Sequence, residues 1–184
     1  MLFFLGGASR TGKSWIAKQI LQRNSIACLS LDWLVMGFTN GMPQCGIHDK
    51  LMPHEIGNRM TPFIEKMCES MIWVGDECVI EGESVLPALT RRLSEKHPEQ
   101  IRACFLGYAD ANVRKKADEI QALSTGDHDW LTNESSQFIL EHVENMIDFS
   151  SMLRSECDLH QQSYVETSGD FLAAQATAME VLEA

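Results

Sequence analysis

Short apolar runs alternate along the chain with longer segments in which apolar residues recur every three or four positions. The short runs cover residues 2–5, 27–31, 78–81, 101–106 and 163–167, and runs of this length and composition predict buried β-strands. The longer segments predict helices that begin near Lys13, Thr61, Leu86, Ala111, Glu134 and Asp170. This alternation of strands and helices favours an α/β protein with a parallel sheet.

The clearest helical pattern lies in residues 134–161, where one face is apolar and the opposite face is charged. Its candidate core positions are Ile139, Val143, Met146, Met152 or Leu153, and Cys157. Two other stretches have no steady period. Residues 37–60 contain two prolines and four glycines and are predicted to form an irregular excursion, and residues 124–133 are predicted to form a second irregular connection.

The composition is that of an ordinary globular protein. With 184 residues, of which 45% are hydrophobic and 22% charged, we expect a single domain over residues 1–184. No apolar run approaches the roughly 20 residues that span a bilayer, and no basic residue precedes the short apolar start of the chain. We therefore expect a cytoplasmic protein without membrane contact. The six cysteines form no C-x-x-C pair and are expected to be small core residues.

The net charge of −11 is carried entirely by the C-terminal part of the chain. Residues 1–109 hold 11 basic and 11 acidic side chains, whereas residues 110–184 hold 4 basic and 15 acidic ones. An acidic chain repels a polyphosphate backbone, so nucleic acid is not expected as a partner. A bound phosphate is expected instead in the balanced N-terminal part.

One motif in that part predicts a phosphate-binding loop. The pattern G-x-x-x-x-G-K-[ST] is formed by Gly7, Ala8, Ser9, Arg10, Thr11, Gly12, Lys13 and Ser14. Such a loop between a strand and a helix directs backbone N–H groups into one concavity at the positive end of the helix dipole. Lys13 is expected to bridge the β- and γ-phosphates as a catalytic residue, and Ser14 to ligate Mg²⁺. The alternative is a glycine-rich turn with an incidental Lys-Ser pair.

Two acidic residues stand at the carboxyl ends of the next two predicted strands, where an open parallel sheet places its functional groups. Asp32 is a candidate general base that also binds the acceptor, although a residue in this place can instead cap the next helix. Glu81 is a candidate Mg²⁺ ligand, although it can instead be a turn residue. Glu83 competes with Glu81 for the same function.

Three arginines are candidates for binding anions. Arg59 stands at the end of the excursion, and Arg91 lies on a predicted helix beside Arg92. Both Arg59 and Arg91 are candidate substrate-binding residues, but an adjacent arginine pair also fits a solvated helix face. Arg10 is expected to contact the nucleotide, or instead to pair with an acid and brace the loop.

The segments GGASRTGKS, LDWL and VIEG resemble the small-molecule kinase branch of the P-loop NTPases. That branch includes adenylate-kinase-like, shikimate-kinase-like, chloramphenicol-phosphotransferase-like and zeta-toxin-like proteins. The segments VIEGESVLP, FLGYAD and YVETSGDF are similar to a bacterial group of small kinase-like proteins, some of them labelled 2-phosphoglycerate-kinase-like. The resemblance implies a three-layer α/β/α P-loop NTPase fold with a five-stranded parallel sheet in the order 2-3-1-4-5.

The resemblance also implies where the acceptor binds and what covers it. The acceptor site would lie over Asp32 and the excursion 37–60, and a lid would lie near residues 111–133. Arg114 is the candidate catalytic cation of that lid, beside Lys115 and Lys116. The chain departs from the pattern in two places. Glu81 stands where many relatives have aspartate, and the segment TGDHDW lacks the arginine cluster of nucleotide kinases.

These features predict an ATP- and Mg²⁺-dependent phosphotransferase that acts on a hydroxyl group of a small molecule. The expected partners are thus a nucleotide and a small-molecule acceptor. A nucleoside or nucleoside monophosphate kinase is one alternative, and a nucleotide-binding regulatory module with little turnover is another. The absence of an N-K-x-D motif favours ATP over GTP.

Overall fold

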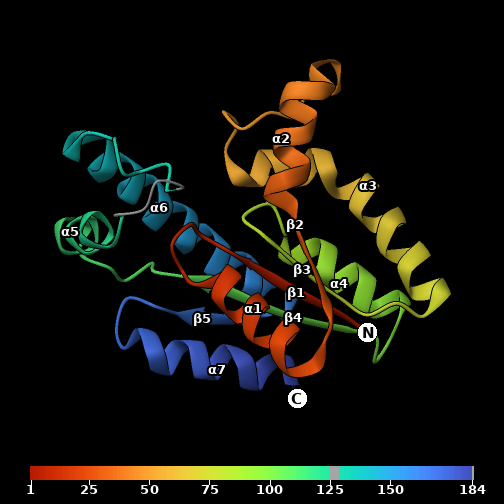
Figure 1. Ribbon diagram of the computed structural model, residues 1–184. Coiled ribbons are helices and arrows are strands. Elements are labelled where there is room, and N and C mark those ends of the chain that lie inside the picture. Colours follow the sequence, from red (N-terminus) through yellow and green to blue (C-terminus); the bar gives the residue numbers. More distant parts are fainter. Residues whose placement is uncertain (125–128, 184) are drawn as a thin grey trace.

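The computed structural model describes residues 1–124 and 129–183. Five parallel strands form one sheet in the order β2-β3-β1-β4-β5 (Figure 1), which confirms the expected fold class and strand order. The strands are β1 (Leu2–Gly7), β2 (Ala27–Ser30), β3 (Cys78–Gly82), β4 (Ile101–Gly107) and β5 (Ser163–Glu166). Every predicted strand is present, and its ends differ from the prediction by at most two residues.

Helices cover both faces of the sheet. They are α1 (Lys13–Asn24), α2 (Leu31–Gly41), α3 (Pro53–Val74), α4 (Pro87–Lys96), α5 (Val113–Leu123), α6 (Ser136–His160) and α7 (Phe171–Glu183). The helices α1 and α7 pack on one face, and α3, α4 and α6 pack on the other (Figure 1). Because side chains alternate along a strand, β1 contributes Leu2 and Phe4 to one core and Leu5 to the other.

The predicted irregular excursion 37–60 is mostly helical, so this prediction was wrong at both ends. Helix α2 continues to Gly41, and α3 begins at Pro53 rather than near Thr61. Proline fits the first turn of a helix because its missing N–H has no helical partner there. Glu55 also accepts a hydrogen bond from the Met52 N–H at 3.1 Å. Only residues 42–52 lie between the helices, with a 3₁₀ turn at Pro43–Cys45.

Helix α6 confirms the strongest periodic pattern. The predicted core residues Ile139, Val143, Met146 and Cys157 are buried, and Leu153 rather than Met152 completes the series. All six cysteines are free, and Cys68, Cys78, Cys104 and Cys157 are buried. Within the described ranges, no helix has the length and apolar character needed to cross a membrane.

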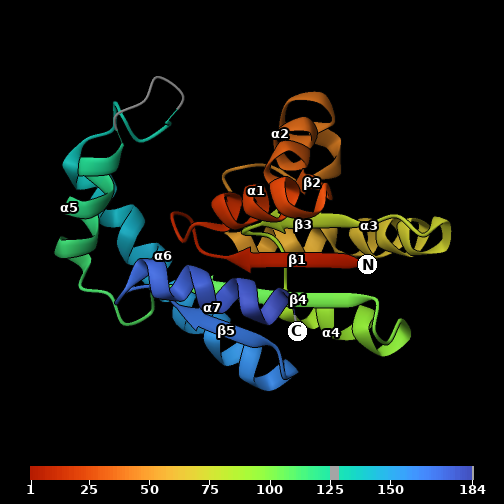
Figure 2. The ribbon, with the colours of Figure 1, turned by 60° about the horizontal axis from the view of Figure 1, so that its bottom comes forward.

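The carboxyl ends of the strands open toward three flanking elements. Figure 2 shows the loop after β1 at this edge, with α2 on one side and with α5 and the start of α6 on the other. Of the predicted lid 111–133, the structure places α5 and the turns at residues 129–133, while residues 125–128 lie outside the described residues. The edge therefore carries both the loop and the segments that surround it.

Candidate functional site

The loop between β1 and α1 depends on two glycines. Gly7 and Gly12 have φ angles of 135° and 89°, a backbone conformation that other residues adopt only with strain. A side chain would not fit at either position. A Cβ atom at Gly7 would lie 2.0 Å from the carbonyl oxygen of Leu106, and one at Gly12 would lie 2.7 Å from the side-chain amide of Gln175.

Hydrogen bonds brace this loop against its neighbours. The Ala8 N–H donates to the Leu106 carbonyl at 3.0 Å, and the Thr11 hydroxyl donates to the Ala8 carbonyl at 2.8 Å. From α7, Gln175 Nε2 donates to the Thr11 carbonyl at 2.8 Å. The first N–H groups of α1 have no acceptor inside their helix and lie beside the loop, where they favour an anion.

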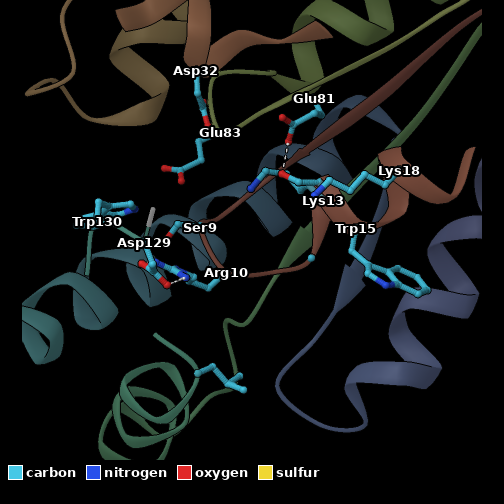
Figure 3. Close-up of a pocket in the computed structure, with 13 residues that line it drawn as sticks. Ser9, Arg10, Lys13, Trp15, Lys18, Asp32, Glu81, Glu83, Asp129 and Trp130 are labelled. Carbon is cyan, nitrogen blue, oxygen red and sulfur yellow. Dashed lines mark hydrogen bonds and ion pairs between the residues drawn. The ribbon is translucent and has the colours of Figure 1, made fainter. Parts of the chain in front are cut away.

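Lys13 and Ser14 begin α1 beneath the loop. Lys13 is buried, and its Nζ donates to the Ala8 carbonyl at 2.7 Å. Ser14 Oγ donates to the buried carboxylate of Glu81 at 3.3 Å, across from the end of β3. Figure 3 shows Glu81 directly over Lys13 and the Ser14 contact as a dashed line. Sequence neighbours and a neighbouring strand thus bring a cation, a hydroxyl and a carboxylate together.

A cavity of about 750 Å³ lies in front of the loop. Among the described residues, its cationic lining consists of Arg10, Lys13 and Lys18. Its acidic lining consists of Asp32, Glu81, Glu83 and Asp129. We call this space the loop cavity; its size is that of a small-molecule site.

Asp32 and Glu83 lie on the far side of the loop cavity from Arg10 (Figure 3). Asp32 stands in the first turn of α2, where Ser30 rather than Asp32 is the N-cap residue. Asp32 is open to the solvent of the cavity, yet protein atoms surround its carboxyl, and this partial burial raises its pKa while Lys13 opposes the rise. Burial likewise raises the pKa of Glu83, with Lys13 again opposing. Glu81 therefore faces Ser14, and Glu83 faces Asp32.

A second cavity of about 710 Å³ adjoins the first, and Asp32, Glu83 and Trp130 line both. We call it the acceptor-side cavity. It extends between α2, residues 49–53, the start of α3 and α6, and its walls are largely apolar. The carboxylates of Asp32 and Glu83 therefore stand where the two spaces meet.

Arg10 is paired with an acid, as one of the two interpretations of this residue predicted. Its guanidinium donates to both carboxylate oxygens of Asp129, from Nη1 at 2.8 Å and from Nη2. The Arg10 contact holds the pKa of Asp129 well below its usual range. The guanidinium also lies over the Trp130 ring, 6.0 Å from its centroid.

Ser9 connects the loop to α6. Its hydroxyl lies 2.7 Å from Nε2 of His142, and burial followed by the charge of Arg10 lowers the pKa of this histidine. The His142 ring meets Trp130 edge to face, with 5.1 Å between centroids. The sequence analysis missed His142 and did not name Asp129 as the partner of Arg10, because neither belongs to a local motif.

The structure does not bring Arg59 or Arg91 to the two cavities. Arg59 is exposed on α3 and donates to the Gly46 carbonyl. Arg91 lies on α4 and pairs with Glu95 one turn later, at 2.8 Å. Both side chains are thus engaged on the surface of their own region, and the expectation that they bind the substrate has no support from their positions.

The predicted lid cations also lie away from the loop cavity. Arg114 and Lys115 are exposed at the start of α5. Lys116 is buried, with Nζ 5.1 Å from the centroid of the Tyr108 ring and 3.6 Å from Glu119. Arg114 lines neither cavity, so its position does not support the predicted catalytic function.

A third cavity, of about 470 Å³, lies beyond Arg10 and Gly12. Its apolar walls include Ile120 and Leu123 of α5 and Phe171 of α7. Because Arg10, Gly12 and Leu123 also line the loop cavity, the two spaces share the loop as a wall. The sequence analysis did not foresee this cavity, because its residues come from distant parts of the chain.

The same architecture occurs in solved structures of kinases. A shikimate kinase from Bacteroides thetaiotaomicron matches with a TM-score of 0.56 and 12% sequence identity, over 100% of this chain and 99% of that one. A gluconokinase from Sinorhizobium meliloti 1021 matches with a TM-score of 0.54 and 15% identity, over 98% and 90%. The chain therefore shares the fold of these two kinases.

A third solved structure has a similar fold. An uncharacterized protein from Eubacterium ventriosum ATCC 27560 matches with a TM-score of 0.56 and 12% identity, over 100% of this chain and 98% of that one. No family model matches the sequence, and no curated protein matches it. The likeness to solved structures thus shows the fold of this chain.

Proposed function

We propose that this protein transfers the γ-phosphoryl group of ATP to a hydroxyl group of a small molecule. One observation carries the proposal. The loop cavity and the acceptor-side cavity meet at Asp32 and Glu83, so a phosphate chain on the loop and a hydroxyl in the second space would approach each other beside a carboxylate. Phosphoryl transfer depends mainly on such positioning and on charge stabilisation.

The nucleotide would extend from the third cavity into the loop cavity. The loop N–H groups and Lys13 would hold the phosphates, and the base would occupy the apolar space beside Ile120, Leu123 and Phe171. To contact a phosphate, Lys13 Nζ would exchange its bond with the Ala8 carbonyl for a phosphate oxygen. The exchange gains a charged partner and leaves the carbonyl to other donors.

Asp32 would accept the proton of the acceptor hydroxyl. In the transfer, the O–H bond breaks toward a carboxylate oxygen of Asp32, the hydroxyl oxygen bonds to the γ-phosphorus, and the bond between the γ-phosphorus and the bridging oxygen breaks to release ADP. The raised pKa of Asp32 makes its carboxylate a stronger base than an exposed aspartate. Lys13 would stabilise the charge on the transferring group.

Ser14 and Glu81 would hold Mg²⁺. A hydroxyl and a carboxylate are oxygen ligands of the kind this cation prefers, and the two are already in contact. In the parts of the chain that the structure describes, no three His, Cys, Asp or Glu side chains form a complete metal cage. Mg²⁺ usually keeps waters and phosphate oxygens as its other ligands. When bound, it would neutralise charge on the phosphate oxygens.

The test separates nucleotide binding from transfer. Calorimetric titration with a non-hydrolysable ATP analogue and Mg²⁺ measures the first, and mass-spectrometric detection of a phosphorylated product across an acceptor panel measures the second. We expect both in the wild type. An absence of analogue binding would contradict the proposal, because transfer requires bound ATP.

A regulatory module with little turnover is the second candidate. It is favoured by the pairing of Arg10 with Asp129 and by the position of Arg114 outside the loop cavity. These two arrangements leave Lys13 and Lys18 as the cations of the loop cavity whose side chains are not already paired with an acid in the described structure. Tight analogue binding without any product would favour this candidate.

A further inference from the structure

The acceptor-side cavity lacks the cationic side chains that accompany the carboxylates of the loop cavity in the described structure. The carboxylates of Asp32, Asp49 and Glu83 line it, and of the described residues, no lysine or arginine does. Because the acceptor of the proposed function would bind in this space, the charge of the lining selects the chemical class of that acceptor. The acceptor class therefore rests on the proposed function.

The cations of this region are engaged elsewhere. Arg59 on α3 donates to the Gly46 carbonyl, and Arg10 is held by Asp129. Lys13 lies in the loop cavity, where its Nζ donates to the Ala8 carbonyl. Among the described residues, an anionic acceptor would therefore meet three carboxylates without a cationic side chain to pair with.

The remaining polar and titratable groups of the cavity do not reverse this charge. Of its titratable groups, His142 has a pKa that burial and Arg10 lower, so its ring is neutral at pH 7. Asn145 and Ser84 are uncharged. The side chains of Asp32 and Glu83 lie together where the two cavities meet. A cation bound beside them would offset the repulsion between two carboxylates.

The walls of the cavity are apolar and deformable. They include the thioether side chains of Met36, Met52 and Met146 and the rings of Trp130 and Phe138. Methionine adapts to irregular shapes, and aromatic rings attract both apolar rings and cations. The volume of about 710 Å³ lies in the range of small-molecule sites.

We propose that the acceptor is an amino alcohol, in which a protonated amine and a hydroxyl are carried on an apolar, ring-sized body. The hydroxyl points to Asp32 at the junction of the cavities, the apolar body lies among the methionines and aromatic rings, and the amine faces Asp49. Asp49 is then a specificity-determining residue. The amine stays protonated throughout, and only the hydroxyl oxygen receives the phosphoryl group.

Three probes with the same benzylic hydroxyl test this assignment. Phenylethanolamine carries a cation, N-acetylphenylethanolamine is neutral, and mandelate carries an anion. Binding of each probe is measured by calorimetry with the ATP analogue and Mg²⁺ present, and product formation is measured with ATP. We expect phenylethanolamine to bind and react best, by about tenfold over the neutral probe and by more over mandelate.

Charge reversal at Asp49 sharpens the test. Asp49→Lys should lower the preference for phenylethanolamine over mandelate by about a hundredfold, because an attraction becomes a repulsion. Asp49→Asn should give an intermediate preference. Asp158→Lys, with the same charge change at an exposed position near the end of α6, should leave the preference as in the wild type. Analogue affinity should be equal in all four proteins.

The outcomes separate the acceptor class from the proposed function. Stronger binding or faster transfer with mandelate, binding of none of the probes, or an unchanged preference in Asp49→Lys would each overturn the amino-alcohol assignment while analogue binding is intact. Loss of analogue binding in the wild type would overturn the kinase proposal itself, and the assignment with it. A preference for the amine that Asp49→Lys abolishes supports both.

Discussion

The loop cavity and the acceptor-side cavity adjoin each other, yet they are built in opposite ways. One wall of the loop cavity comes from the consecutive residues Gly7–Ser14, whose backbone shape is fixed by two glycines. The acceptor-side cavity is assembled from α2, residues 49–53, the segment after β3, and α6. The backbone N–H groups of one loop and one helix N-terminus can hold a phosphate, so a contiguous motif can supply the site. An acceptor is recognised by side chains that only the fold brings together.

Loss of the loop lysine should give the largest effect. Lys13→Ala removes the buried cation that would contact the phosphates of the proposed nucleotide, and we expect transfer to fall by about a thousandfold. Stabilisation of the protein by ATP and Mg²⁺ should disappear with it. Thermal unfolding with and without nucleotide measures the second effect. Lys66→Ala, which removes an exposed lysine on α3, should leave both properties unchanged.

Loss of the proposed base should impair phosphoryl transfer without impairing nucleotide binding. Asp32→Asn keeps the shape of the side chain but cannot accept the hydroxyl proton, and we expect transfer to fall by about a hundredfold or more. Affinity for the ATP analogue, measured by calorimetry, should stay near that of the wild type. If transfer were unchanged, the proton would have to go to another group, of which Glu83 is the nearest candidate at the junction.

The ion pair between Arg10 and Asp129 is expected to stabilise the folded protein. Asp129→Asn and Arg10→Gln should each lower the free energy of unfolding by about 1 to 2 kcal/mol, because the pair is bidentate and partly buried. The double variant should lose less than the sum of the two. Urea unfolding of the four proteins gives the coupling. Purely additive losses would contradict a direct interaction.

Glu83 is expected to lower the free energy of unfolding of the protein when no ligand is bound. Its pKa is raised in the folded state, chiefly by burial, so the stability of the wild type falls as the pH rises through that folded value. Glu83→Gln removes this loss and should raise the free energy of unfolding by about 1 kcal/mol at pH 8. The gain should shrink at low pH, where the carboxyl is protonated in both states. Unfolding curves at several pH values measure the difference.

The smallest effect is expected at the contact between the loop and α6. The pKa of His142 is lowered from its ordinary value of 6.5, so the unfolded chain binds a proton first as the pH falls below that value. The wild type should lose stability between pH 6.5 and the lower folded value, and His142→Gln should lose less over the same range. Equal losses in urea unfolding would show that this histidine is not shielded from water.

The sequence contained most of the fold because its signals are local. The buried strands, the phosphate-binding loop and α6 each depend on residues that are neighbours in the chain. Helix α3 shows the limit of such signals. It continues through Pro62, since Met60, Ile64 and Cys68 bury one face of it in the core, and this tertiary packing outweighs the lost backbone hydrogen bond.

The candidate site was less predictable, because several of its contacts join distant parts of the chain. Gln175 reaches the loop from α7, and Asp129 and His142 reach it from beyond α5. The reverse holds for Arg59 and Arg91, which look available in the sequence but are engaged by a carbonyl and a carboxylate in their own neighbourhoods. Residue type identifies candidates, and only the packed structure selects among them.

The Arg10–Asp129 pair would couple binding of the nucleotide to binding of the acceptor. A triphosphate bound at the loop would compete with Asp129 for the guanidinium of Arg10. Asp129 is followed directly by Trp130, which lines both cavities. Binding of ATP would thus weaken a contact that holds one wall of the acceptor-side cavity in place. If ATP changes the affinity for an acceptor that contacts the Trp130 indole, that acceptor must change the affinity for ATP by the same factor.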